Sequence, residues 1–533
     1  MVHDTDKSRR KKGIRVKRLM ILLLALTLAL TLLCGAADGE EKEMDMENND
    51  RVFYEIFVGS FSDSDGDGTG DLNGIANRMD YLAALGIEGI WLTPVFLSPS
   101  YHKYDVTDYY QIDPAFGTEE DLKELIARCH EQDIKLILDL PLNHTGADNS
   151  WFRNFRNAHL MHNPNNIWYD FYSWLEPDAA IPSGRHFMRI TQPDLLVEDN
   201  FSDHMPELNF DNERVREKVL DVAVYWMNLG VDGFRFDAAK YPYYGEHDRN
   251  VAFWEWYMAE LKKINPDIYA VAEVWDGDGV TKRYMKAFNC FRFSTSQAEG
   301  LIAETAKGGN VNKFTKATEQ YLETIHSINP DAMNVPFIAN HDMDRASGYL
   351  TVAGGRMQMA ANLYILQPGS PFIYYGEEIG LRGSRGGANT DANRRLAMLW
   401  GDGDTVKDPA GSTYDKQTPY SVKDLEGMAG SILKHYRNLL AIRKANPEIA
   451  KGDYLALAFK DTKMGGFLCT LDGRTVGVFH NTTEKTLKVD LSEATNRTFT
   501  QIAASIAVDP FECVAELEGT VLTLGPQTSA VLW

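Results

Sequence analysis

Short apolar runs alternate with longer amphipathic stretches over most of the chain. The runs are rich in β-branched and aromatic residues, as is typical of buried parallel strands, and the stretches between them show the apolar spacing of helices. The predicted strands are Val52–Val58, Gly89–Thr93, Lys135–Leu140, Val231–Asp237, Ile268–Glu273, Phe288–Phe293, Val335–Asn340 and Pro371–Tyr375. Eight strands in alternation with helices predict an α/β fold, a closed parallel (β/α)8 TIM barrel.

The spacing of these runs also predicts the domain organisation. The interval between the third and fourth runs is much longer than the others and is rich in Trp, Asn and Pro, which indicates an inserted subdomain over residues 145–211. After residue 446 the pattern changes to short alternating segments separated by Asp-Gly, Asn-Thr and Gly-Pro turns. We therefore expect a barrel over 51–144 and 212–446 and a C-terminal antiparallel β-sandwich over 447–533.

Residues 1–37 have a different character. Eight Lys and Arg residues precede the apolar run Leu19–Leu33, which small residues follow, and this order is typical of a signal peptide for export. A retained membrane anchor is the alternative, but the apolar run is short for one. The segment around Cys34 also resembles a bacterial lipobox, so we expect either a cell-surface lipoprotein anchored at Cys34 or an extracellular protein cleaved after Ala37.

The charge balance narrows the class of partner. The whole chain has a net charge of −22, and the chain without its first 33 residues, which hold eight basic and two acidic residues, has a net charge of −28. Such a surface repels nucleic acid and anionic membranes and suits a neutral substrate. The acidic stretch 38–50 predicts a solvated tether, and we expect a monomer that contacts a membrane only through a lipid at Cys34.

The five cysteines show no metal-binding or redox spacing. Cys469 and Cys513 both fall in the predicted C-terminal domain. They form either a disulfide or two free thiols, and the sequence leaves both open.

Polar residues gather where four of the predicted strands end. The ends of parallel strands meet on one rim of a barrel, and a carboxyl group buried there pays a desolvation penalty that calls for a chemical reason. The residues at these ends are Asp139, Asn143 and His144, Arg235 and Asp237, Glu273 and Trp275, and Asn340, His341 and Asp342.

Motifs around these residues carry a family resemblance. The segments DLPLNH, GFRFDAAKY, AEVW and FIANHD follow one another in this order, together with GIWLTPVF, MPELN and GEEIGLRG. From about Arg51 onward the chain resembles the α-amylase family of retaining glycoside hydrolases, family 13. The resemblance implies cleavage of α-glucosidic bonds through a covalent glycosyl-enzyme intermediate.

The residues themselves support distinct roles for two of the acids. Side chains alternate along a strand, so Arg235 and Asp237 point the same way, and the guanidinium is expected to lower the pKa of Asp237 and keep it ionised as the nucleophile. Glu273 has an apolar run before it and Trp275 after it, which favours the protonated state of a general acid.

The resemblance implies further substrate contacts. Asp342 is the third catalytic acid, which binds sugar hydroxyls, and His144 and His341 hydrogen-bond the same sugar ring. A structural role is the alternative for a single histidine, but these two flank acids on separate strand ends.

Four more residues match substrate-binding positions of the family. Tyr104 stacks on a sugar and Asp105 lies beside it. Arg345 pairs with Asp105 or forms a surface ion pair. Lys240 contacts the sugar on the reducing side of the cleaved bond, or opens a helix as a solvated lysine.

A second group of oxygen donors predicts a calcium site. Oxygen-bearing residues recur every second position, and Gly68 permits a tight turn. The expected ligands are Asp63, Asp65, Asp67, Thr69 and Asp71. A metal-free Asp-Gly turn is the alternative, because Gly74 stands where a helix-loop-helix calcium loop has its glutamate. A second calcium at Asn143 is left open.

Substrate choice within the family rests on mixed signals. Lys240 and the segment Glu273–Trp275 resemble endo-acting amylases, whereas the calcium loop and GEEIGLRG resemble oligo-1,6-glucosidases. The chain is most similar to bacterial α-amylases intermediate between the oligo-1,6-glucosidase and neopullulanase groups, which implies hydrolysis of internal α-1,4 bonds in starch and maltooligosaccharides. The alternatives are an exo-acting α-glucosidase, an oligo-1,6-glucosidase or a transglycosylase, and a non-catalytic glycan-binding surface protein, against which the three intact acids argue.

Overall fold

The computed structural model describes residues 50–386 and 390–533. The expected signal peptide, Cys34 and nearly all of the acidic tether lie outside these residues, so export and lipidation stay predictions. The expected monomeric state also stays a prediction. Among the helices that the structure describes, none is both long enough and apolar enough to cross a bilayer.

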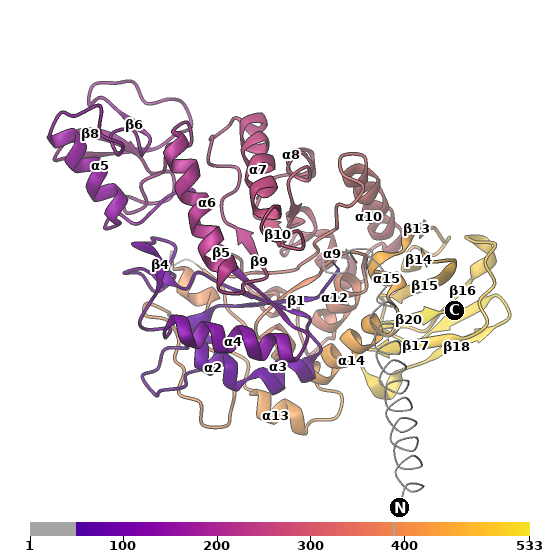
Figure 1. The fold of residues 1–533 in the computed structure, drawn as a ribbon. Coiled ribbons are helices and arrows are strands. Elements are labelled where there is room, and N and C mark those ends of the chain that lie inside the picture. Colours follow the sequence, from indigo (N-terminus) through magenta and orange to yellow (C-terminus); the bar gives the residue numbers. More distant parts are fainter. Residues whose placement is uncertain (1–49, 387–389) are drawn as a thin grey trace, which may run out of the picture. The chain divides into compact units, whose positions relative to one another are not determined.

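Seven parallel strands form the central sheet, in the order β11-β10-β9-β5-β2-β1-β12. They are β1 (Phe53–Ile56), β2 (Gly89–Leu92), β5 (Lys135–Leu140), β9 (Gly233–Phe236), β10 (Tyr269–Ala272), β11 (Asn289–Cys290) and β12 (Phe372–Tyr374). Each strand lies inside a run predicted from the sequence, and Figure 1 shows β1, β5, β9 and β10 with helices around them.

The segment around Val335 closes this sheet into a barrel. Val335 forms a parallel bridge to Phe291 beside β11, and the backbone N–H of Phe372 in β12 donates to the carbonyl of Pro336 at 3.0 Å. The segment therefore occupies the position of the eighth strand of the barrel, although it is too irregular to be a strand itself. Pro336 has no N–H to donate, which explains why the predicted strand Val335–Asn340 does not form a regular ladder. The predicted (β/α)8 barrel is confirmed.

Aromatic side chains fill the inside of the barrel. Phe53 stacks on Phe372 with ring centroids 4.8 Å apart and contacts Tyr269 at 4.4 Å. Trp91 lies in the same buried cluster and reaches the ring of His341 at 5.6 Å. The packed interior thus ends directly beneath the rim where the polar strand ends meet.

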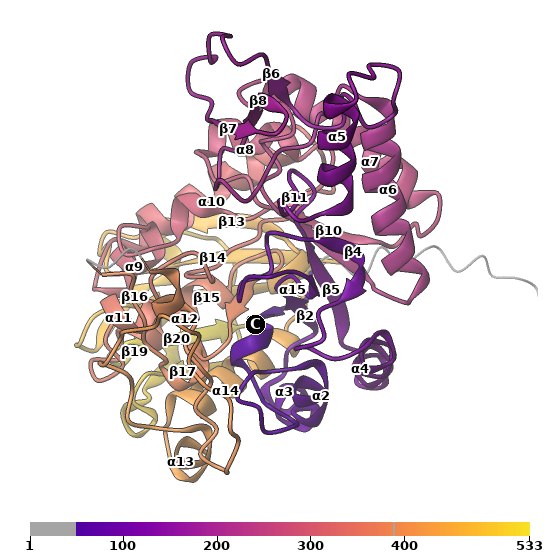
Figure 2. The ribbon, with the colours of Figure 1, turned by 90° about the vertical axis from the view of Figure 1, so that its left-hand side faces the viewer.

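Helices cover the outside of the barrel (Figures 1 and 2). Helix α4 shows how the sequence specifies them: Thr118 and Asp121 form a capping box at its start, and Leu122, Leu125, Ile126 and Cys129 form its buried face. The helices are α2 (Leu72–Asn77), α3 (Met79–Leu85), α4 (Glu119–Glu131), α6 (Glu213–Asn228), α7 (His247–Lys262), α8 (Asp278–Tyr284), α9 (Leu301–Ala306), α10 (Val311–His326), α11 (Ala346–Tyr349), α12 (Arg356–Ile365), α13 (Val422–Gly427), α14 (Ile432–Lys444) and α15 (Glu448–Lys451).

Two excursions leave the barrel on its polar rim. The hairpin β3 (Phe96–Leu97) and β4 (Asp108–Ile112) follows β2. Between β5 and α6 the chain forms α5 (Ser150–Leu160) and an antiparallel sheet in the order β6-β8-β7. Its strands are β6 (Trp174–Leu175), β7 (Phe187–Thr191) and β8 (Asp194–Glu198). An antiparallel bridge between His144 and Glu207 joins the start and the end of this insertion at the rim.

The C-terminal region is antiparallel throughout. One sheet has the order β13-β14-β15-β20-β17 and the other the order β16-β19-β18. The strands are β13 (Asp453–Leu457), β14 (Met464–Leu471), β15 (Arg474–Asn481), β16 (Leu487–Asp490), β17 (Ile502–Ala507), β18 (Ala515–Glu518), β19 (Val521–Leu524) and β20 (Thr528–Leu532). Residues from both sheets, among them Phe479, Leu522 and Leu524, share one apolar core, which agrees with the predicted two-sheet domain.

The cysteines of the described residues are free thiols. Cys469 is buried in β14, whereas Cys513 is exposed and lies 3.6 Å from the hydroxyl of Ser505. The disulfide considered for this pair is therefore absent, because one thiol faces the core and the other faces solvent.

Candidate active site

Strand register brings two acids together at the rim. Phe236 at the end of β9 pairs with Ala272 at the end of β10, so Asp237 and Glu273 follow at equivalent positions on neighbouring strands. The backbone N–H of Glu273 donates to the carbonyl of Phe236 at 2.9 Å, which continues the ladder up to the acids. Their proximity is thus set by the backbone.

Arg235 connects these acids to a third carboxyl group. The Nη1 of this buried arginine lies 2.5 Å from Asp237 Oδ1 and 2.8 Å from Asp139 Oδ1, and its Nη2 lies 3.0 Å from Glu273 Oε2. Its guanidinium also lies 5.1 Å from the ring centroid of Trp91. One fully buried cation therefore forms ion pairs with three carboxyl groups. Asp139 stood at a predicted strand end, but its direct contact with Arg235 was not predicted.

The pKa of Asp237 differs from the sequence-based expectation. Burial raises it above its ordinary value, and the lowering effect of Arg235 does not fully cancel that rise because the charge of Asp139 adds to it. The prediction that Arg235 alone would lower the pKa of Asp237 was wrong, since it ignored the second acid on the same guanidinium.

Glu273 has the environment of a proton donor. The pKa of Glu273 is raised to about 7: burial raises it most, Arg235 opposes the rise, and the charges of Asp237 and Asp342 add to it. The Oε2 atom also accepts the backbone N–H of Ala238 at 3.1 Å. Trp275, which we expected to create this environment, instead stacks on Phe293 at 4.9 Å and is 40% exposed. The protonated state therefore follows from burial and neighbouring acids.

Asp342 is held as an anion by two cationic side chains. Its Oδ1 lies 2.9 Å from Nη2 of Arg395, and its Oδ2 lies 3.1 Å from Nε2 of His341. Burial opposes ionisation, but these two partners hold the pKa of Asp342 well below its ordinary value. Sequence reasoning missed Arg395, although the Arg-Arg pair at 394–395, soon after a glycine-rich loop, was an available signal.

Two buried histidines at the rim have different hydrogen-bond partners. Burial lowers the pKa of His144 to about 4, so this imidazole is neutral at neutral pH, and its Nε2 lies 3.2 Å from the carbonyl of Tyr104. His341 is also fully buried, but its Nδ1 lies 2.6 Å from the carboxyl group of Glu55 in β1. Sequence reasoning missed Glu55, a charged residue in the middle of an apolar run.

Tyr104 and Asp105 lie in the β3–β4 hairpin, and only one of them joins the acid network. The hydroxyl of Tyr104 donates to Asp139 Oδ2 at 2.9 Å and lies 2.6 Å from His341 Nε2. Asp105 is buried and accepts a hydrogen bond from Ser98 Oγ at 2.7 Å.

Arg345 does not pair with Asp105, and both interpretations of this arginine were wrong. It is buried, donates to the backbone carbonyl of Tyr375 at 2.6 Å, and packs against the rings of Tyr374 and Tyr375. It is neither a surface arginine nor a partner of Asp105, because its guanidinium is held by these two tyrosines at the end of β12.

A cavity of about 690 Å³ adjoins two of the rim acids. Glu273 and Asp342 line it, and so do Lys240 and the aromatic side chains of Phe201, Tyr241 and Trp275. Lys240 donates to the backbone carbonyl of Trp275 at 2.8 Å and lies 3.2 Å from Asp276, so it is not a freely solvated side chain. Aromatic faces beside buried acids suit a ligand with both apolar ring faces and hydroxyl groups.

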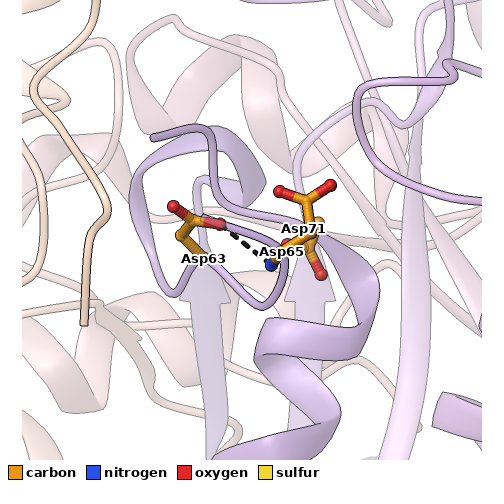
Figure 3. Close-up of side chains that lie close together, drawn as sticks. All are labelled: Asp63, Asp65 and Asp71. Carbon is orange, nitrogen blue, oxygen red and sulfur yellow. Dashed lines mark hydrogen bonds between the residues drawn. The ribbon is translucent and has the colours of Figure 1, made fainter. Parts of the chain in front are cut away.

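The predicted metal loop lies between β1 and α2, and Figure 3 shows three of its aspartates close together. One oxygen atom from each of Asp63, Asp65 and Asp71 lies within 4.8 Å of the other two. Asp67 is on the same turn but its carboxylate is not part of this group, and Asp67 Oδ1 accepts the N–H of Thr69. The predicted ligand role of Thr69 stays a prediction. The hydroxyl of Thr405, from the segment after β12, donates to Asp63 at 2.6 Å and helps to fix the loop.

Comparisons with known proteins agree with this geometry. A family model described as the α-amylase catalytic domain matches residues 55–452. Alpha-amylase 3 of Dictyoglomus thermophilum is 36% identical over 439 residues, which cover 81% of this chain and 84% of that protein. A 4-alpha-glucanotransferase of Thermotoga maritima is 32% identical, over 81% of this chain and 95% of that protein. The solved structure of Amy13B of Eubacterium rectale superposes with a TM-score of 0.84 at 30% identity, covering 90% of this chain and 95% of that one.

Proposed function

Because the chain belongs to the α-amylase family of glycoside hydrolases, we propose that it hydrolyses internal α-1,4-glucosidic bonds in starch and maltooligosaccharides with retention of configuration. The observation that carries this proposal is the bridging of Asp237 and Glu273 by one guanidinium. Such a short bridge favours the spacing of about 5 to 5.5 Å of a retaining pair over the wider spacing that admits a water.

The two carboxyl groups divide the chemistry between them. Asp237 has the shorter contact to Arg235, at 2.5 Å against 3.0 Å for Glu273, so we assign the nucleophile to Asp237 and the proton donor to Glu273. Its carboxylate attacks the anomeric carbon while Glu273 donates a proton to the departing glycosidic oxygen. In the second step Glu273 removes a proton from water, which attacks the same carbon and releases Asp237.

Asp342 and the aromatic residues bind the sugars around the cleaved bond. An ionised Asp342 can accept hydrogen bonds from sugar hydroxyls and stabilise the positive charge that develops on the ring. Phe201, Tyr241 and Trp275 line the same cavity as Lys240 and offer faces for sugars further along the substrate. The cavity therefore suits an oligosaccharide rather than a single sugar.

A transferase or an exo-acting enzyme would use the same acids. The similarity to a glucanotransferase as well as to an α-amylase keeps transfer as the second candidate. The two differ in what attacks the covalent intermediate, which is water in hydrolysis and a sugar hydroxyl in transfer.

We expect soluble starch to yield a mixture of maltooligosaccharides whose new reducing ends are α-anomers. The measurement is chromatography of the products together with an NMR spectrum recorded before mutarotation. Maltotriose, pullulan and cyclodextrin serve as comparison substrates. Glucose as the sole early product would contradict endo action, and products longer than maltotriose from maltotriose alone would favour the transferase.

We also propose that the loop of Asp63, Asp65 and Asp71 holds Ca²⁺. The donor set fits a hard cation, because it consists of carboxylate oxygens gathered on one turn. Asp71 caps α2 through Gly74 N and accepts from Ser64 as well, so a bound cation would join the loop to the start of a barrel helix. The ion would be structural, since the loop contributes none of the acids of the active site.

Calcium is expected to raise the melting temperature by a few degrees over that measured in EGTA. A ligand at about one hundred times its Kd adds roughly 2.7 kcal/mol to the free energy of unfolding. Asp65→Asn should remove most of this difference, whereas the exposed Asp267→Asn should keep it. The measurement is differential scanning calorimetry, and identical melting curves with calcium and EGTA would count against the site.

A further inference from the structure

Glu55 is a buried acid for which the reaction as described has no use. It lies in β1, is 1% exposed, and pairs with Trp91 of β2 and Tyr374 of β12 in the sheet. Its Oε1 accepts the backbone N–H of His341 at 3.2 Å and lies 2.6 Å from His341 Nδ1. A buried carboxylate needs such a partner, because its desolvation is otherwise uncompensated.

The hydrogen bonds around His341 fix where its protons are. Tyr104 has a single hydroxyl proton, and it is directed to Asp139 at 2.9 Å. His341 Nε2, 2.6 Å from the same hydroxyl oxygen and 3.1 Å from Asp342 Oδ2, must then be a donor. When Nδ1 also donates to the carboxyl group of Glu55, 2.6 Å away, both ring nitrogens carry protons and the imidazole is a cation.

We propose that Glu55 is a positioning residue that keeps His341 doubly protonated, so that His341 holds Asp342 ionised and oriented toward the substrate. The inference rests on the proposed function of Asp342. It adds that the charge of Asp342 depends on a carboxyl group that never touches the sugar.

The surroundings of His341 support this arrangement from each side. Burial alone disfavours the charged ring, but the carboxyl groups of Asp342 and Glu55 raise the pKa of His341 to about 10. Tyr104 stacks on one face at 5.5 Å and Trp91 contacts the ring edge-on. The other charged groups nearby are Asp139, which acts through Tyr104, and Arg395, whose Nε donates to the backbone carbonyl of His341.

The test compares Glu55→Gln with Glu55→Asp. Glutamine keeps the size of the side chain but removes its charge, so the pKa of His341 should fall toward its ordinary value of about 6.5. The imidazolium is then lost as the pH rises through that value. We expect kcat/KM of Glu55→Gln to fall about 10- to 100-fold at pH 8 and much less at pH 5.5, whereas Glu55→Asp should keep most of the wild-type profile.

A readout that does not depend on activity separates this inference from the proposed function. In ¹³C-histidine NMR spectra, with the His341 signal identified by its loss in His341→Gln, the ring should stay protonated at pH 8 in the wild type and titrate near neutral pH in Glu55→Gln. A wild-type His341 that is neutral at pH 8 would overturn the proposal, even if Glu55→Gln did not fold. So would equal losses in Glu55→Gln and Glu55→Asp at every pH, which would indicate packing alone.

Discussion

Glu273→Gln is expected to lower kcat on starch by roughly 10³-fold or more, within the range that general acid catalysis contributes. The glutamine can still accept the hydrogen bonds of Arg235 and of the Ala238 N–H, so substrate binding and folding should be retained. What it cannot do is donate an acidic proton to the leaving oxygen. The loss should be much smaller on an α-glucosyl fluoride, whose leaving group needs little protonation.

The pH profile gives an independent check of the same residue. Because the pKa of Glu273 is raised to about 7, the wild-type activity should fall as the pH rises through that value and the acid loses its proton. This alkaline limb should be absent from the residual activity of Glu273→Gln. The matched control is Glu131→Gln, an exposed glutamate at the end of α4, which should keep wild-type rates. A wild-type rate in Glu273→Gln would show that the proton donor is another group.

Much of this fold could be predicted because strand ends carry their own signals. Apolar runs gave the strands, and each polar cluster stood directly after one of them, so the rim of acids followed from barrel topology. The irregular form of the closing segment at Val335 was harder to predict, since its apolar pattern is that of a strand but Pro336 prevents a regular ladder.

The rest of the site depends on contacts between residues far apart in the sequence. Arg395 reaches Asp342 from 53 positions further along the chain, and Glu55 reaches His341 across 286 positions. No local pattern shows such pairs. The sequence therefore indicated which acids matter but not which cations and anions set their charges.

The error at Asp237 has the same origin. Its neighbour Arg235 was visible in the sequence, but Asp139 shares that guanidinium from another strand and shifts the balance. Arg345 shows the opposite case, in which a residue close to the motif packs between tyrosines under the rim instead of entering the site.

Asp237→Ala is expected to lower activity by roughly 10⁴-fold or more, because it removes the group that forms the covalent intermediate. It also opens space for a small anion beside Arg235, so azide should restore turnover of an activated α-glucoside. Azide would attack from the face that Asp237 uses, and the product should be the β-glycosyl azide. The measurement is the rate with and without azide, with the product identified by NMR.

Two matched variants make this result specific to Asp237. Asp237→Asn should be as inactive as the alanine variant but should not respond to azide, because its amide still fills the space beside Arg235. Asp139→Ala tests the competing carboxyl group, which shares Nη1 of Arg235 but also binds Tyr104 below the rim. If azide rescued Asp139→Ala and left Asp237→Ala inactive, Asp139 would be the nucleophile, and the rim would have to be reinterpreted with Asp237 as its supporting charge.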